Sequence, residues 1–322
     1  MIDLSNEFAI GIDIGGTNTK YGIVNHRGEI LEKGELKTDD YPKIEAYVDA
    51  LYDAVSVLIK QHAEGGGVKG IGIGAPNGNF YTGTIEYAPN LQWEGIIPLT
   101  KLVTAKFGLP SALTNDANAA AVGEMNYGAA RGMRDFIMIT LGTGVGSGIV
   151  ANGQLILGHD GFAGELGHTI IRPGGRKHWS TELDGSLEAY CSATGIVLTA
   201  KEMLDNSKEE SLLRKYSDKL DSKIVYECAV KGDKIAQDVY NFTGQILGEA
   251  LANFIMFSSP EAIVLFGGVI KAGDLIMKPT KEHMEKNLLP IFQNKVKLIF
   301  SELKEADAAI LGASALVWEI RE

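Results

Sequence analysis

Hydrophobic and polar residues near the start of the chain follow the pattern of β-strands. Residues 8–16 ("FAIGIDIGG") and 19–24 ("TKYGIV") predict two strands that are joined by a short glycine turn. A polar turn at residues 25–28 ("NHRG") leads to residues 29–36 ("EILEKGEL"), which predict a third strand. The three strands form a meander.

Helical spacing replaces this pattern further along the chain. Residues 68–78 ("VKGIGIGAPNG") then predict a buried strand that runs into a loop. A helix at residues 98–107, a short strand at 112–114 and a helix from 117 to about 127 complete the first half. Strands followed by helices indicate an α/β fold. The first helix, within residues 43–62, is predicted by apolar residues at Ile44, Tyr47, Val48, Leu51, Val55, Leu58 and Ile59.

The meander is repeated at the start of the second half. Residues 12–15 (IDIG) match residues 139–142 (ITLG), and after a one-residue offset residues 22–24 match residues 148–150, both GIV. A single glycine hairpin is usually only a tight turn. A duplicated pair favours two similar domains, each with a glycine turn whose backbone N–H groups can bind phosphate.

Composition excludes several classes of function. The 322-residue chain has a net charge of −11 and a pI near 5.1, so we expect neither a nucleic-acid partner nor an anionic membrane partner. No apolar run approaches a membrane span and residues 1–8 do not resemble a signal peptide, so we expect a cytoplasmic protein. Cys191 and Cys228 lie far apart in the sequence and are expected in the core.

Two familiar phosphate-binding motifs are missing. The sequence contains no Gly-Lys dipeptide and therefore no P-loop. Gly70, Gly72 and Ala75 formally satisfy a dinucleotide-binding fingerprint, but they lie within a strand pattern and Pro76 follows. We interpret that match as accidental.

Polar residues cluster in two other places. Asn115 and Asp116 stand where a predicted strand meets a helix, so Asp116 is either a helix N-cap or a carboxylate that accepts a proton from a hydroxyl. Glu165, His168 and Glu188 lie among glycines in "GFAGELGH" and "DGSLEAY". They either line a solvated loop or bind neighbouring hydroxyls of a sugar.

Taken together, these motifs resemble those of the ROK (repressor, open reading frame, kinase) sugar kinases of the actin-like ATPase superfamily. "DIGGTNTK" and "LGTGVGSG" are similar to the two phosphate motifs, "LTNDANAAAVGE" to the catalytic segment, and "GELGH" with "GSLEAY" to the sugar-binding signature. "IVLFGGVI" resembles the adenosine motif, with Phe266 in place of a glycine, and "ADAAILGASALVWEI" resembles the closing helix.

The resemblance implies two actin-like (ribonuclease H-like) α/β domains with a catalytic cleft between them. Residues 1–115 and 307–322 would form the smaller N-terminal domain, and residues 116–306 the larger C-terminal domain. An apolar stripe at residues 235–257 predicts a core helix. A homodimer is expected from the family.

The resemblance also implies residue roles. Asp116 would be the base that takes the proton from the sugar 6-hydroxyl, and Asp13 would stand near Mg²⁺, through water. Sugar would be bound by Asn90, Asn115, Asp116, Glu165, His168 and Glu188. ATP would be bound by Asp13, Gly15, Gly16, Thr17, Lys20, Thr143, Gly144, Gly267 and Gly268.

Glucose is the first choice of substrate, because Glu165, His168 and Glu188 occur together as in glucokinases. N-acetylmannosamine, N-acetylglucosamine and fructose are alternative substrates. A non-catalytic sugar-binding regulator is the alternative from another class. Relatives that are repressors carry a helix-turn-helix before the shared core, and here the first phosphate strand begins by Phe8, so we expect an enzyme.

One segment departs from the family pattern. Many relatives bind a structural Zn²⁺ through the histidine of "GELGH" and three cysteines, and the matching cysteine places here hold Trp179, Thr181 and Ser186. Indole and neutral hydroxyl groups are poor replacements for thiolates. We therefore expect no zinc, and a loop at residues 172–186 that is ordered by packing, with Trp179 as the candidate centre.

Overall fold

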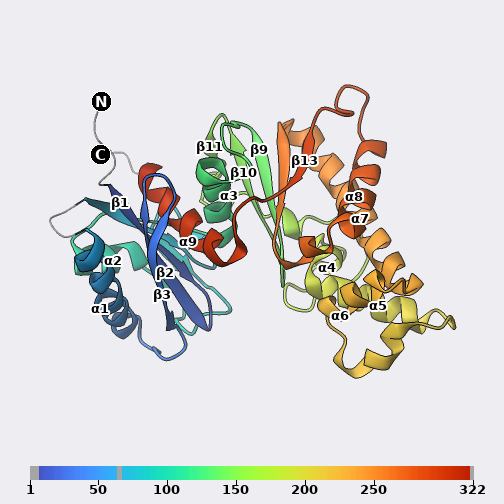
Figure 1. Cartoon of the computed structure of the whole chain (residues 1–322), viewed down its shortest axis with the longest axis horizontal. Helices are drawn as coiled ribbons and strands as arrows, with labels where there is room; N and C mark the ends of the chain where they lie inside the picture. Colours follow the sequence, from blue (N-terminus) through green and yellow to red (C-terminus); the bar gives the residue numbers. More distant parts are fainter. Residues whose placement is uncertain (1–6, 64–66, 320–322) are drawn as a thin grey trace. The chain divides into compact units, whose positions relative to one another are not determined.

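The computed structural model describes residues 7–63 and 67–319. The chain divides into two compact units. Unit 1 consists of Met1–Arg134, Gly148–Gly164 and Ser301–Glu322, and unit 2 of Asp135–Ser147 and Glu165–Phe300. Figure 1 labels many of their helices and strands.

Unit 1 is built on a five-stranded sheet with the order β3-β2-β1-β4-β8. The first three strands are antiparallel neighbours, which confirms the predicted meander, while β4 and β8 run parallel to β1. The strands are β1 (Phe8–Ile14), β2 (Asn18–Asn25), β3 (Ile30–Lys37), β4 (Val68–Gly74) and β8 (Ser111–Thr114).

Helices cover both faces of this sheet (Figure 1). On one face, α1 (Ile44–His62) and α2 (Leu99–Phe107) share a buried cluster with the isoleucines of β1 and β4. On the other face lie α3 (Asp116–Tyr127) and α9 (Glu305–Ala315). Because side chains alternate along a strand, the isoleucines of β1 face one helix layer and Asp13 faces the other.

Glycine allows the second helix layer to approach the sheet closely. A methyl group placed on Gly72 of β4 would lie 1.8 Å from the backbone oxygen of Ala313 in α9. This contact gives Gly72 a packing role, which agrees with the interpretation that the dinucleotide-binding match is accidental.

A second five-stranded sheet has the order β11-β10-β9-β12-β13, which matches the first sheet strand for strand. Here β12 lies between β9 and β13 and runs parallel to both. The predicted internal repeat is therefore confirmed. The strands are β9 (Phe136–Leu141), β10 (Val145–Ala151), β11 (Gln154–Leu155), β12 (Ala262–Phe266) and β13 (Lys297–Phe300).

The helices of unit 2 include the predicted core helix, α7 (Lys234–Ser258), whose apolar stripe is buried. Gly244 of α7 lies against Pro279 of α8 and Gly248 lies against Met284, so the two helices pack closely and run in the same direction. Cys191 and Cys228 are free and buried, as predicted. The other helices are α4 (Glu188–Cys191), α5 (Ala193–Asp205), α6 (Ser222–Val230) and α8 (Asp274–Lys286).

Short elements complete the fold. Strands β5 (Gly78–Asn79), β6 (Thr84–Glu86) and β7 (Ile96–Ile97) form a small antiparallel sheet. In the part of the chain that the structure describes, no helix has the length and apolar character needed to cross a membrane. The 3₁₀ helices are η2 (Leu166–His168), η3 (Leu212–Lys219), η4 (Gly268–Ala272) and η5 (Leu316–Glu319).

The compact units and the predicted domains differ in where they place α3. This helix belongs to unit 1 because it packs on α9, with Gly123 against Gly312. The prediction assigned residues from 116 onward to the second domain. The domain boundaries at residues 115 and 307 stay a prediction.

Candidate functional site

The predicted catalytic residues lie at the ends of the strands of unit 1. The strand register places Lys20, Asp13, Gly74 and Thr114 side by side on β2, β1, β4 and β8. Asn115 and Asp116 follow directly and begin α3. The carboxyl ends of parallel strands are where open α/β sheets bind ligands.

Asp13 and Asp116 interact electrostatically across this edge. Partial burial, followed by the nearby Asp116 carboxylate, raises the pKa of Asp13 to about 6, although Lys20 opposes the shift. Gly74 leaves space here, since a methyl group on it would lie 3.8 Å from Oδ1 of Asp13 and 3.9 Å from Cα of Asp116. A cation beside Asp13 would therefore be favourable.

The side chain of Asp116 reaches solvent, yet its carboxylate is not an ordinary surface acid. Protein atoms around it displace water and raise its pKa, while the backbone N–H groups of Ala117 and of Asp116 itself oppose that shift. The Ala117 N–H donates to Oδ1 at 2.9 Å. A carboxylate with a raised pKa is a stronger base.

Asn115, not Asp116, is the N-cap of α3. Its Oδ1 accepts the backbone N–H of Asn118 at 2.7 Å. The interpretation of Asp116 as the N-cap residue is therefore wrong. With Oδ1 of Asn115 used in the cap, its Nδ2 is the group that can donate to a ligand.

Asn118 is a polar residue that sequence reasoning missed. Its side chain is 1% exposed and its Oδ1 has no hydrogen-bond partner among the described residues. Thr114 Oγ1 is also buried and has no hydrogen-bond partner among the described residues. Their position in "LTNDANAAAVGE" was visible in the sequence, but their lack of a partner depends on the three-dimensional packing of α3.

The first glycine turn joins β1 to β2. The Gly15 N–H donates to the Asn18 carbonyl at 2.9 Å, and a methyl group on Gly16 would lie 2.3 Å from the backbone oxygen of Asn90. The structure therefore brings Asn90, which is distant in sequence, against this turn. The side chains of Thr17, Lys20 and Asn90 are exposed and free to meet a ligand.

The second glycine turn joins β9 to β10 and touches Glu188. The backbone N–H of Val145 donates to Oε2 of Glu188 at 2.7 Å. A methyl group on Gly144 would lie 2.4 Å from the same oxygen. Thr143, at the tip of the turn, is exposed.

Glu165 and His168 lie beside the same strand start as Glu188. The Leu166 N–H donates to Ser147 Oγ at 3.1 Å, which anchors the short helix η2 to β10. His168 Nε2 is 3.7 Å from Glu165 Oε2, and the buried Nδ1 of His168 has no partner among the described residues. Unit 2 thus gathers the three predicted sugar-binding residues around the start of β10.

The predicted adenosine motif follows β12. Gly267 has φ +105°, and a methyl group on it would lie 2.5 Å from the Leu141 carbonyl at the end of β9. Gly268 is exposed and faces open space. Only glycine suits position 267, which has both a positive φ and no room for a side chain.

The residues near His168 do not fit a zinc site. Trp179 is 69% exposed, the Thr181 hydroxyl lies 3.2 Å from His178 Nδ1, and the buried Ser186 hydroxyl faces the Ala189 N–H. No group of three or more His, Cys, Asp and Glu side chains suited to a metal occurs in residues 7–63 and 67–319. The absence of zinc stays a prediction.

Trp179 does not order the loop at residues 172–186, so that expectation is wrong. Arg176 has this role instead, because its guanidinium donates to both carboxylate oxygens of Glu202 and to the carbonyl oxygens of Ala189 and Gly195. The group also stacks 4.6 Å from the ring of Tyr190. Sequence reasoning missed Arg176 because these partners belong to later helices.

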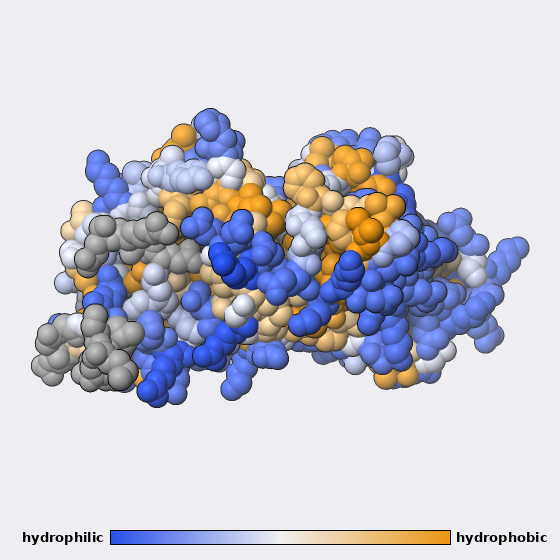
Figure 2. Space-filling view, turned by 90° about the horizontal axis from the view of Figure 1, so that it is seen from above, coloured by the Kyte–Doolittle hydropathy of each residue, from blue (hydrophilic) through white to orange (hydrophobic). Residues whose placement is uncertain are grey.

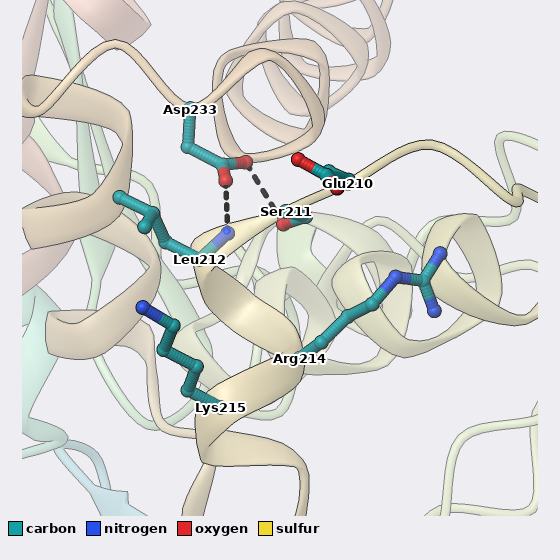
Figure 3. A pocket seen from close by; sticks show the side chains of 6 residues that line it. All are labelled: Glu210, Ser211, Leu212, Arg214, Lys215 and Asp233. Atoms are coloured by element: carbon teal, nitrogen blue, oxygen red, sulfur yellow. Dashed lines mark hydrogen bonds between the residues drawn. The ribbon is translucent and has the colours of Figure 1, made fainter.

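A separate cavity of about 560 Å³ in unit 2 contains none of the predicted residues (Figure 3). Asp233 in its wall accepts the Ser211 hydroxyl, the Leu212 N–H and the Ala236 N–H. Its carboxylate therefore caps α7 and fixes η3, which is a structural role.

Comparison with known proteins agrees with these motifs. Residues 9–320 match the sequence profile of the ROK family. The glucokinase of Halalkalibacterium halodurans is 37% identical over 318 residues, which cover 98% of this chain and 96% of the relative. The xylose repressor of Caldicellulosiruptor bescii is 29% identical over 315 residues, which cover 96% of this chain and 77% of the repressor.

A solved structure gives the same result for the fold. The ROK family glucokinase from Streptomyces griseus, in complex with glucose and AMPPNP, is 32% identical with a TM-score of 0.77, and the match covers 97% of this chain and 100% of that chain. Both the family and the actin-like α/β fold class predicted from the sequence are confirmed. The chain belongs to the ROK family.

Proposed function

We propose that this protein transfers the γ-phosphoryl group of ATP to the 6-hydroxyl of glucose. The observation that carries the proposal is the carboxylate pair of Asp13 and Asp116 at the strand ends of unit 1, where both pKa values are raised. The similarity to a glucokinase with bound glucose and AMPPNP supports the choice of both substrates.

Asp116 is the proposed catalytic base. Its carboxylate accepts the proton of the 6-hydroxyl while the hydroxyl oxygen bonds to the γ-phosphorus and the bond to the bridging oxygen of ADP breaks. The raised pKa suits this task, because it makes the carboxylate a better proton acceptor. The product is glucose 6-phosphate.

The two glycine turns are the proposed phosphate-binding elements. Backbone N–H groups can bind phosphate oxygens even though the protein carries a net charge of −11. When bound, Mg²⁺ neutralises phosphate charge, and Asp13 would hold it through water. Phosphates are assigned to Gly15, Gly16, Thr17, Lys20, Thr143 and Gly144, and adenosine to Gly267 and Gly268.

Five polar residues besides Asp116 are the proposed sugar ligands. Asn90 and Asn115 are assigned to hydroxyls in the middle of the ring, and Glu165, His168 and Glu188 to those near the anomeric carbon. All except Glu188 are exposed or partly exposed, so they can reach a ligand. A carboxylate or amide that accepts from a hydroxyl rejects analogues that lack it.

ADP release across a panel of sugars tests the proposed function. Glucose should give the highest kcat/KM among glucose, fructose, mannose, N-acetylglucosamine and N-acetylmannosamine, with Mg²⁺ and ATP present. A higher kcat/KM for an N-acetylhexosamine would reassign the substrate. Sugar binding without ADP release would favour the regulator, the class represented by the xylose repressor.

We also propose that the protein is a homodimer without structural zinc. Exposed hydrophobic side chains stand at one end of the parallel pair α7 and α8, with Phe257 86%, Leu289 54% and Ile291 62% exposed. Figure 2 shows several groups of hydrophobic residues on a face that is otherwise largely hydrophilic. Light scattering and metal analysis, with melting curves in EDTA, test the two statements.

A further inference from the structure

His178 is a buried histidine to which neither the family motifs nor the proposed function gives a role. Only 6% of it is exposed. It begins a tight turn in which the His178 N–H donates to the Leu183 carbonyl at 2.9 Å and the Glu182 N–H donates to the His178 carbonyl at 3.1 Å. Arg176, two residues earlier, fixes the same loop to α4 and α5.

The contacts of the His178 ring determine which nitrogen carries the proton. Nδ1 lies 3.4 Å from the backbone N–H of Thr181, and the hydroxyls of Thr181 and Ser180 lie at 3.2 and 3.3 Å. Because a backbone N–H can only donate, Nδ1 is the acceptor. The proton is therefore on Nε2, which lies 3.1 Å from Oε1 of Glu188.

Glu188 is consequently held at both carboxylate oxygens. Oε1 lies 3.1 Å from Nε2 of His178, and Oε2 accepts the Val145 N–H at 2.7 Å. A carboxylate oxygen can accept more than one hydrogen bond, so these contacts fix the orientation of Glu188 and leave capacity for a ligand hydroxyl.

We propose that His178 is a positioning residue for glucose binding, which it serves by orienting the Glu188 carboxylate. The inference rests on the proposed function of Glu188 as a sugar ligand. Its contribution should be to glucose affinity, because His178 acts through Glu188 and not on the phosphates.

Two replacements separate the two sides of the ring. His178→Gln places an amide near the position of Nε2 and can still donate to Glu188, whereas His178→Asn places one near Nδ1 and can keep only the contacts of the turn. Both remain polar and similar in size. His62→Leu is the matched control, because it removes a histidine–glutamate contact of the same kind, at 2.6 Å to Glu32, from α1.

The experiment measures KM for glucose and for ATP, kcat, glucose affinity by calorimetry without nucleotide, and thermal melting. We expect His178→Asn to raise KM and Kd for glucose by about tenfold, because it removes the polar group that lies 3.1 Å from the Glu188 carboxylate. His178→Gln should stay within about threefold of the wild type. KM for ATP and the values for His62→Leu should be unchanged.

Two deoxy analogues of glucose test whether His178 acts through Glu188. Glu188 is assigned to hydroxyls near the anomeric carbon, so the affinity lost in His178→Asn should shrink for either 1-deoxyglucose or 2-deoxyglucose. An equal loss for glucose and both analogues would overturn the inference.

Three further outcomes would overturn it. If His178→Asn keeps the glucose affinity and His178→Gln loses it, the turn matters and the Glu188 contact does not. If both variants lower melting temperature and change both KM values in parallel, the role is structural. If Glu188→Gln leaves glucose affinity unchanged, the assignment of Glu188 fails and this inference with it. Failure of the proposed function is distinguishable, since the wild type would then release no ADP with glucose.

Discussion

The two copies of the repeated meander share one order of strands, and they carry a charged and a neutral residue at the matched positions 13 and 140. In the first copy, Asp13 precedes the glycine turn and interacts with Asp116 and Lys20. In the second copy the matching residue is Thr140, whose Oγ1 accepts the Gly146 N–H at 3.1 Å inside its own turn. The first copy therefore places a charge at the strand end, and the second uses a neutral hydroxyl to fix its turn.

The second copy obtains a carboxylate from elsewhere in the chain. Glu188, at the start of α4, accepts the Val145 N–H and lies against Gly144. One copy thus places its acid within the repeat, for a proposed role in phosphoryl transfer, and the other holds an acid from outside it, for a proposed role in sugar binding. The two similar hairpins therefore differ in where their nearest carboxylate comes from.

The largest expected effect comes from removing the base of the first copy. Asp116→Asn should lower kcat by at least about 10²-fold with glucose, because it cannot accept the proton. Calorimetry should show retained glucose binding, and melting should show an intact fold. A folded variant with near-normal turnover would remove Asp116 from the mechanism.

Asp13→Asn tests the difference between Asp13 in the first copy and Thr140 in the second copy, through the response of activity to metal. We expect about a tenfold or greater rise in the Mg²⁺ concentration needed for half-maximal activity, because an amide binds the hydrated ion more weakly. Thr140→Val is the matched change in the second copy and should leave that concentration unchanged. Equal metal responses in the two variants would contradict the distinction.

A substitution of an uncharged residue can break the contact between the second glycine turn and Glu188. Gly144→Ala would place its methyl group 2.4 Å from Oε2 of Glu188, so Glu188 must shift. We expect about a tenfold rise in KM for glucose. Gly142→Ala is the control in the same turn, since nothing lies within 4 Å of its methyl position. Similar KM values in the two variants would show that the contact does not matter.

The Asp13 carboxyl should make the stability of the protein depend on pH. Because the pKa of Asp13 is raised to about 6 in the folded state, folding favours its protonated form. The free energy of unfolding should therefore fall, relative to Asp13→Asn, as pH rises from about 4 to about 6, by on the order of 1 kcal/mol. Without metal, Asp13→Asn should be the more stable protein at pH 7 by urea titration. A less stable variant would contradict the raised pKa.

Thr140→Val should have the smallest effect. Loss of the hydroxyl leaves the Gly146 N–H without its acceptor and should lower the free energy of unfolding by about 1 kcal/mol. Turnover should remain within about threefold, because the hydroxyl is used inside the turn. A kcat loss comparable to that of Asp116→Asn would mean that both copies take part in the chemistry.

The sequence predicted those parts of the fold and the site that depend on a local pattern of residues. Residues 117–127 were predicted as a helix, which begins at Asp116, and the alternation around Asp13 predicted its strand. The repeat predicted two matching sheets. These features depend on neighbours in the chain, whose periodicity is visible in one dimension.

Other features depend on contacts between distant segments and could not be predicted. His178 meets Glu188 and Arg176 meets Glu202 only because the loop folds back on α4 and α5. Trp179 was the candidate centre of that loop on the strength of its size, but it points to solvent. The exchange of N-cap between Asp116 and Asn115 depends on where the helix begins, within one residue.

The most direct test of the account is the identity of the phosphorylated product. Wild-type protein, ATP, Mg²⁺ and glucose should yield glucose 6-phosphate and ADP in equal amounts by ³¹P NMR, and Asp116→Asn should yield neither on the same timescale. Product phosphorylated at another hydroxyl, or the same yield from Asp116→Asn, would contradict the assignment of Asp116 as the base at the 6-hydroxyl.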